Sequence, residues 1–248
     1  MTSPPACVVV GSSGGLGAST LALAVGRRLA AVGPPATVVD LATTGGGLDV
    51  TAGVEHLAGP RWSALAGGGV PAVDSLLAAL PAEDGCRVLS AGGPAPRTLT
   101  DEAVAETLAA LVGHAAPLVV DAPATSGHLS LLLAGGPLVV VVAGLRTRQL
   151  ADADALVDRL VDLTESVTAP ADLRLVTRGA RPSAGVLDDV EAHLGVAHLQ
   201  HLPDDPFVAK EAERGLWPGT ARTAVRRCAD TVAAALTGAR AGPVGRAS

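Results

Sequence analysis

Short aliphatic runs alternate with helical patterns along most of the chain. The runs are apolar at consecutive positions, which is typical of parallel strands buried on both faces. Strand–helix–strand order implies right-handed crossovers. The sequence therefore predicts an α/β fold with a mostly parallel, twisted sheet and helices on both faces. The expected strands are 6–10, 36–40, 86–90, 117–121, 137–143 and 172–177, with a weaker one near 196–200; the expected helices are 18–32, 71–80, 101–113, 147–166, 184–194 and 219–237.

The length and composition indicate one domain built on an aliphatic core. The chain has 248 residues, 48% of them apolar, and its only aromatic residues are Trp62, Phe207 and Trp217. Val, Leu and Ala must therefore fill the space between helices and sheet. We expect the domain to span residues 1–237. Residues 41–71, rich in Gly and Thr, should form a long loop with one or two short helices, and residues 238–248 a disordered tail.

Charge and cysteine content argue against several classes of function. A net charge of −6 gives no support for nucleic-acid binding. Cys7, Cys86 and Cys228 are widely spaced and odd in number, which argues against a disulfide framework or a zinc site. We see neither a signal peptide nor an apolar stretch of roughly 18 residues. A cytoplasmic location is expected, without peripheral membrane contact.

A glycine-rich segment connects the first expected strand to the first helix. It runs GSSGGLGAST over residues 11–20, and such turns direct backbone N–H groups at an anion, usually a phosphate. Gly11, Gly15, Gly17 and Asp40 also fit the dinucleotide turn of short-chain dehydrogenases. Those enzymes need a catalytic tyrosine, and this sequence has none. A tight turn without a ligand is the third interpretation.

The hydroxyl residues Ser19 and Thr20 favour a P-loop, which needs a hydroxyl after its last glycine to hold Mg²⁺. Residues 14–21 (GGLGASTL) resemble the deviant Walker A loop of the MinD/ParA family, KGGxGKTT. They are most similar to the CpaE/TadZ branch, which includes the septum site-determining and CpaE-like proteins of actinobacteria. The fold that this resemblance implies is a P-loop NTPase.

Other segments extend the resemblance over roughly residues 6–236. Residues 38–49 resemble switch I (DxDxxGGxLD), residues 118–123 resemble Walker B (hhhhDxP), and residues 202–215 resemble a conserved C-terminal region of the family. The resemblance implies ATP and Mg²⁺ as cofactors. Ser19, Asp40 and Asp121 would serve Mg²⁺, although either Asp can instead merely cap its loop. The implied nucleotide-binding residues are Gly14, Gly15, Leu16, Gly17, Ala18, Ser19 and Thr20.

The sequence departs from the family at the catalytic positions. The deviant lysine corresponds to Ser13, the lysine that contacts the β- and γ-phosphates to Ala18, and the second Asp of switch I to Ala42. Since a hydrogen bond to a charged group is worth about 1.5–3 kcal/mol, each lost lysine should weaken binding roughly tenfold to a hundredfold. We therefore expect weakened ATP and Mg²⁺ binding, no catalytic residues and weak or absent ATPase activity.

A few residues outside these motifs need an interpretation. Thr177-Arg178 lies where the family often has a base-contacting Asn. His198 and His201 are expected to be surface residues, since no metal-ligand spacing accompanies them. Arg146 or Arg178 could supply charge to the phosphates if the fold brings either close. The arginine-bearing helix over 219–237 is expected to pack on the domain rather than on a membrane.

The resemblance implies a positioning or regulatory factor for septum placement, or for Tad/Flp pilus or type IV-like secretion assembly. Its expected partners are a second copy of the chain and a pilus or secretion ATPase or the cell-division machinery, with recruitment to a pole or septum. The family often carries a receiver-like domain before the P-loop; this sequence begins at the first strand, so targeting by that module is not expected. The alternative is an active ATPase cycling between monomer and dimer. DNA partitioning is disfavoured by the acidic charge.

Overall fold

The computed structural model describes residues 6–43, 45–66, 71–92, 99–165, 167 and 169–238. The strands are β1 (Ala6–Gly11), β2 (Ala36–Asp40), β3 (Ala82–Glu83), β4 (Cys86–Leu89), β5 (Leu118–Pro123), β6 (Leu138–Gly144), β7 (Asp172–Gly179) and β8 (His198–Pro203). The helices are α1 (Ala18–Val32), α2 (Leu48–Ala52), α3 (Trp62–Leu65), α4 (Val73–Ala79), α5 (Asp101–Val112), α6 (Leu129–Leu133), α7 (Thr147–Glu165), α8 (Val186–Leu194), α9 (Pro206–Glu213) and α10 (Ala224–Gly238).

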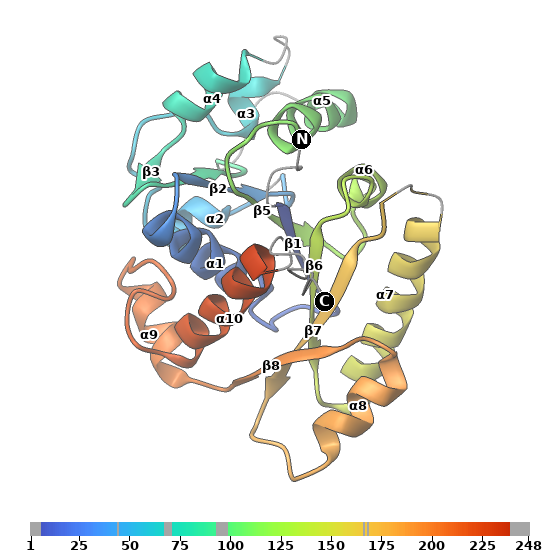
Figure 1. Ribbon diagram of the computed structural model, residues 1–248. Helices are drawn as coiled ribbons and strands as arrows, with labels where there is room; N and C mark the ends of the chain where they lie inside the picture. Colours follow the sequence, from blue (N-terminus) through green and yellow to red (C-terminus); the bar gives the residue numbers. More distant parts are fainter. Residues whose placement is uncertain are drawn as a thin grey trace, which may run out of the picture.

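The strands form one sheet in the order β3-β4-β2-β5-β1-β6-β7-β8. All neighbouring pairs are parallel except β3 and β4, which are antiparallel. The predicted mostly parallel sheet is therefore confirmed. Strand β1 lies in the middle, between β5 and β6, so the glycine-rich segment that follows it emerges at the centre of the sheet's carboxyl edge (Figure 1). Parallel α/β sheets bind their ligands at this edge.

Helices cover both faces of the sheet, as predicted. Residues of α1, α2 and α10 share one apolar core with the sheet, and residues of α3 to α8 share the other. Successive residues of β1 alternate between the two: Val9 belongs to the first core, and Val8 and Val10 to the second. This alternation follows from the period of two in a strand and explains why the run is apolar at every position.

Three elements were not predicted, and one begins later than predicted. The two-residue strand β3 and the short helices α6 and α9 carry too little periodic pattern to be recognised. The predicted helix over 219–237 begins at Ala224, because Pro218 and Gly219 (φ 79°) interrupt the helical backbone. Of the expected tail, residues 239–248 lie outside the described residues, and Gly238 is the last residue of α10.

Helices α1 and α10 lie side by side, and α1 holds the end of the glycine-rich segment (Figure 1). Gly26 of α1 faces β2 so closely that an added Cβ would overlap the Val38 side chain. The apolar side chains of α10, among them Val225, Val232 and Leu236, are buried in the same core. The predicted packing of this helix on the sheet is confirmed. In the described part of the chain, no helix is long and apolar enough to cross a membrane.

Candidate nucleotide site at the carboxyl end of the central strand

The segment between β1 and α1 forms the floor of a cleft of about 610 Å³. Gly15 and Gly17 adopt left-handed backbone angles, with φ of 77° and 84°, which glycine adopts without strain. A Cβ added at Gly14, Gly15 or Gly17 would meet nothing within 4 Å, so the backbone here faces open space. All seven predicted nucleotide-binding residues, from Gly14 to Thr20, line the cleft, as does Asp121, whereas Asp40 does not. The cleft is also lined by Gly11, Ser12, Ser13, Ala42, Ala122, Pro123 and Ala124.

This floor offers hydrogen-bond donors that carry no charge. Helix α1 begins after Gly17 without a side-chain cap, and its first backbone bond runs from Leu21 N–H to the Gly17 carbonyl. The N–H groups of Ala18, Ser19 and Thr20, in the first turn of the helix, are therefore left for a ligand at the positive end of the helix. The hydroxyl oxygens of Ser12 and Ser13 are buried and have no hydrogen-bond partner among the described residues. The floor therefore suits an anion with several oxygen acceptors.

Asp121 and Ser19 stand together at the cleft wall. Asp121 lies on β5 and is 8% exposed, and its carboxylate accepts a hydrogen bond from the Ser19 hydroxyl. Burial raises the pKa of Asp121 to about 6, and the Ser19 hydrogen bond opposes the rise. A carboxylate beside a hydroxyl is an oxygen donor set that suits Mg²⁺. The two residues fit a magnesium ion accompanying a bound phosphate.

Asp40 pairs with Asp121 in the β2–β5 register, but its carboxylate is already used by the backbone. One oxygen accepts the N–H of Ala42 at 2.8 Å and the other accepts the N–H of Leu48 at 3.0 Å. Burial raises the pKa of Asp40 to about 7 against the lowering effect of these bonds. Asp40 thus caps the loop that follows β2. Its role in binding Mg²⁺ stays a prediction.

The cleft lacks cationic side chains. None of its lining residues in the described part of the chain is Lys, Arg or His. Ser13, Ala18 and Ala42, which stand at the three departures found in the sequence, all line it. Arg146 and Arg178 line a neighbouring pocket instead, where Arg178 donates to the Pro203 carbonyl at 2.8 Å and pairs with Asp204.

Comparison with solved structures identifies the fold. The chain superposes on a chain of the MinC:MinD cell division protein complex from Aquifex aeolicus with a TM-score of 0.73 and 19% identity, covering 94% of this chain and 96% of that one. A ParA family ATPase from Chlorobium tepidum gives 0.66 and 15%, covering 94% and 98%. Septum site-determining MinD of Pyrococcus horikoshii, solved with Mg-ADP, gives 0.64 and 16%, covering 98% and 99%. The chain has the MinD/ParA-type P-loop NTPase fold.

Curated sequences add relatives without a known activity. Uncharacterised proteins from two strains of Mycobacterium tuberculosis are 31% identical over 242 residues, or 97% of this chain. The chain spans 66% of their length, slightly less than two thirds. No protein-family model matches the sequence.

In this MinD/ParA-type fold, the segment that resembles switch I is held by a buried ion pair that the sequence did not reveal. Asp49 of α2 is 4% exposed and pairs with Arg61 Nε at 2.8 Å. Arg61 also donates to the carbonyls of Val54, Leu57 and Gly59, at 3.1–3.3 Å. The neighbouring Trp62 donates its indole N–H to the Asp40 carbonyl at 2.6 Å. An isolated Arg-Trp pair in a glycine-rich loop gave no signal for this role.

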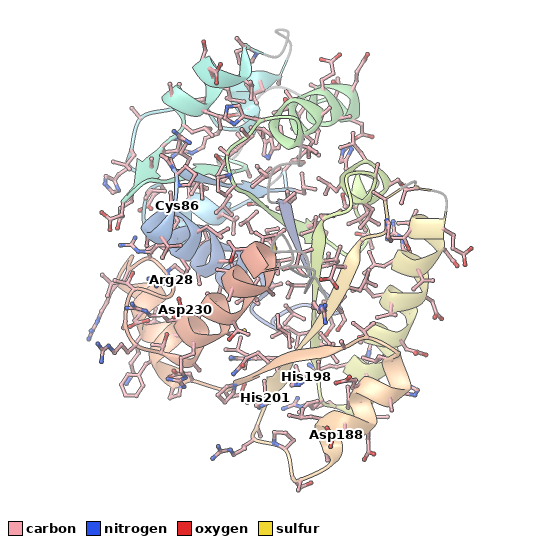
Figure 2. The ribbon with its side chains drawn as sticks, viewed as in Figure 1. Arg28, Cys86, Asp188, His198, His201 and Asp230 are labelled. Carbon is pink, nitrogen blue, oxygen red and sulfur yellow. The ribbon has the colours of Figure 1, made fainter. Side chains whose placement is uncertain are left out.

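His198 and His201, which were predicted to be surface residues, are only partly exposed. Both are half-buried at the edge strand β8, and they lie close to each other (Figure 2). His198 Nε2 and His201 Nδ1 each lie 3.0 Å from the fully buried hydroxyl of Thr177. Burial lowers the pKa of both imidazoles. Thr177, considered for base contact, thus directs its hydroxyl at this pair. The described residues contain no group of three or more His, Cys, Asp or Glu that could hold a metal.

The raised pKa of Asp40 predicts a pH-dependent stability of the ligand-free protein. The raised pKa lets the folded state keep a proton on Asp40 up to about pH 7, whereas the unfolded chain releases it near the ordinary aspartate pKa of 3.8. The resulting stabilisation is complete below about pH 4 and is lost as the pH rises through about 7, at up to 1.36 kcal/mol per pH unit. In urea unfolding without Mg²⁺ or nucleotide, the free energy of unfolding of the wild type should fall by about 2 kcal/mol relative to that of Asp40→Asn between about pH 5 and pH 8.

The comparison between wild type and variant reports on Asp40 and on its electrostatic coupling to Asp121, whose pKa is also raised, to about 6. The two half-buried histidines have lowered pKa values and so act in the opposite direction, destabilising the fold as the pH falls below about 6.5. Their effect is common to both proteins and cancels in the difference. Curves that stay parallel over the whole range would show that Asp40 is ionised in the folded state.

Proposed function

We propose that the protein binds a magnesium nucleotide without efficient hydrolysis. In this proposal it acts as a positioning or regulatory factor for septum placement, or for Tad/Flp pilus or type IV-like secretion assembly. The observation that carries the binding is the cleft at the end of β1, where an open backbone cradle faces the Ser19–Asp121 pair. The observation that carries the lack of turnover is that the same cleft is lined without a cation in the described residues.

Different residues of the cleft would bind the phosphates and the magnesium ion. The backbone N–H groups before Leu21 and the free hydroxyls of Ser12 and Ser13 donate to phosphate oxygens. Ser19 and Asp121 hold the magnesium ion, which neutralises part of the phosphate charge when bound. Leu16, 5% exposed, packs in the core beneath the loop and fixes its shape. These contacts position a nucleotide but place no fixed positive charge beside it.

Hydrolysis needs groups that this cleft does not supply. Phosphoryl transfer depends on stabilising charge at the transferred group and on orienting the attacking water. Ala42 stands where the resemblance expects the water-activating Asp, and a methyl group accepts no proton. The alternative of an active ATPase would require Arg146 or Arg178 to substitute, and both line a different pocket. The geometry therefore favours binding without turnover.

The cellular part of the proposal rests on the structural neighbours. One of them is solved in a complex of MinC and MinD, and others are ParA-type or septum site-determining proteins. We propose that this chain likewise forms a homodimer and recruits a division or secretion component at a pole or septum. A fluorescent fusion of the full-length protein tests this directly. Uniform fluorescence throughout dividing and piliated cells would contradict it.

Binding and turnover can be separated in one experiment. Purified protein with Mg²⁺-ATP should retain nucleotide on equilibrium dialysis yet release no phosphate above a protein-free blank. Adding Ala18→Lys together with Ala42→Asp should tighten nucleotide binding roughly tenfold to a hundredfold, since one charged contact is worth about 1.5–3 kcal/mol. Ser19→Ala serves as the control that weakens binding. Phosphate release by the wild type at a rate that Ser19→Ala abolishes would contradict the proposal.

A further inference from the structure

The hydrogen-bond donors in the cleft suit the α- and β-phosphates of a nucleotide better than the γ-phosphate. A P-loop backbone cradles the α- and β-phosphates, whereas its lysine reaches the β- and γ-phosphates. In this cleft the backbone cradle is complete, because the glycine turns at Gly15 and Gly17 and the uncapped start of α1 are present. The lysine position is Ala18. The backbone contacts to the first two phosphates are thus preserved, whereas the third phosphate, which the backbone does not cradle, loses its lysine contact.

Charge adds to this imbalance. A triphosphate carries one more negative charge than a diphosphate, and no lining residue in the described part of the chain is cationic. The ionisable group at the wall is the Asp121 carboxylate. Asp121 is 8% exposed, so solvent screens its charge weakly. An added γ-phosphate would meet like charge and lose hydration without a compensating contact.

From these two observations we infer that the cleft selects a nucleoside diphosphate over the corresponding triphosphate. The inference rests on the proposed nucleotide binding and names the ligand of that same site. Ala18 is the residue that determines the selectivity, because it removes the γ-phosphate contact and leaves the backbone cradle intact. Ser13 contributes in the same direction, since its hydroxyl replaces a second lysine at the cleft.

The size of the selectivity follows from the missing contact. Loss of one hydrogen bond to a charged group corresponds to roughly a tenfold to hundredfold change in affinity. The Kd of Mg²⁺-ADP should therefore be at least about tenfold lower than that of Mg²⁺-ATP. Pyrophosphate and tripolyphosphate should show the same order, because the selectivity lies in the phosphates and not in the base.

Titration calorimetry of the purified chain tests the inference with ADP, ATP and a non-hydrolysable ATP analogue, each with Mg²⁺. Ala18→Lys should tighten the triphosphates more than ADP and so abolish or reverse the preference. Ala31→Lys is the matched control: it places the same lysine on an exposed position of the same helix, away from the cleft, and should leave the ratio unchanged. Circular dichroism melting checks that each variant is folded.

The possible outcomes are distinguishable. A tighter Kd for ADP that Ala18→Lys reverses supports the inference. Equal Kd values, or a tighter Kd for the triphosphates in the wild type, would overturn the selectivity and leave nucleotide binding itself intact. If neither ADP nor ATP binds the wild type, both the selectivity and the proposed function fail. The pyrophosphate arm does not depend on Ala18→Lys folding, and a preference there for tripolyphosphate would also overturn the inference.

Discussion

Replacing Arg61 with methionine is expected to lower the free energy of unfolding by about 3–5 kcal/mol. Arg61 is 9% exposed and its partner Asp49 is 4% exposed, so the variant would leave a buried carboxylate without its counter-ion. The carbonyls of Val54, Leu57 and Gly59 would lose a donor at the same time. Removing one partner of a buried pair is costly because the remaining charge keeps its desolvation penalty.

Urea unfolding followed by circular dichroism measures this loss. Arg28→Met is the matched control, because Arg28 also pairs with an aspartate, Asp230, but on the surface between α1 and α10 (Figure 2). Surface pairs contribute about 0–1 kcal/mol, so this control should change stability little. The double variant Arg61→Met/Asp49→Leu should recover part of the loss, since it removes the stranded charge as well. A loss below about 1 kcal/mol in Arg61→Met would show that the pair is solvated and does not hold the loop.

Trp217→Ala is expected to cost about 3–5 kcal/mol, the range found for large buried aromatic residues. Trp217 is 2% exposed and joins the segment before α10 to α1, where its indole N–H donates to the Leu23 carbonyl at 3.0 Å. The Arg27 guanidinium lies 5.7 Å from the ring centroid, which adds a cation–π contact. The truncation would leave a cavity against the helix that carries the phosphate cradle, so nucleotide affinity should fall together with stability.

Two further variants show whether the loss of stability in Trp217→Ala comes from its buried position. Trp217→Phe keeps most of the apolar volume and loses the indole donor, so its cost should be intermediate. Phe207→Ala truncates an aromatic side chain that is 64% exposed, and it should change stability by less than about 0.5 kcal/mol. If Trp217→Ala lowers the free energy of unfolding no more than Phe207→Ala does, Trp217 does not hold the segment before α10 against α1.

Local patterns were enough to predict the sheet and the position of the glycine-rich turn that lines the cleft. Each strand predicted with a strong aliphatic run is present, and the glycine-rich segment lies at the carboxyl end of the central strand. The motifs predicted that Ser19 and Asp121 serve one site, and the structure places them in contact although more than a hundred residues separate them in the sequence. This succeeded because strand order in such folds places the ends of β1 and β5 side by side.

Residues whose role depends on a distant partner were missed. Arg61 and Trp62 lie in a loop without periodicity, and they acquire their roles only because the chain folds back over β2 and α2. His198 and His201 were predicted to be surface residues, because their own segment does not show that they contact the hydroxyl of Thr177 on the neighbouring strand. The short helix α9 is only eight residues long, too short for a helical period to be distinguished from chance.

The amino-acid order alone determined the α/β class, the glycine-rich turn after the first strand, and the presence of Ser13, Ala18 and Ala42 where the resemblance expects two lysines and an aspartate. These are properties of residue type and local spacing. The tertiary structure alone decided that Arg146 and Arg178 do not line the cleft at the end of β1, and that both carboxylate oxygens of Asp40 accept backbone N–H groups. The reason is physical: a charge acts through distance and burial, and only the folded chain sets both.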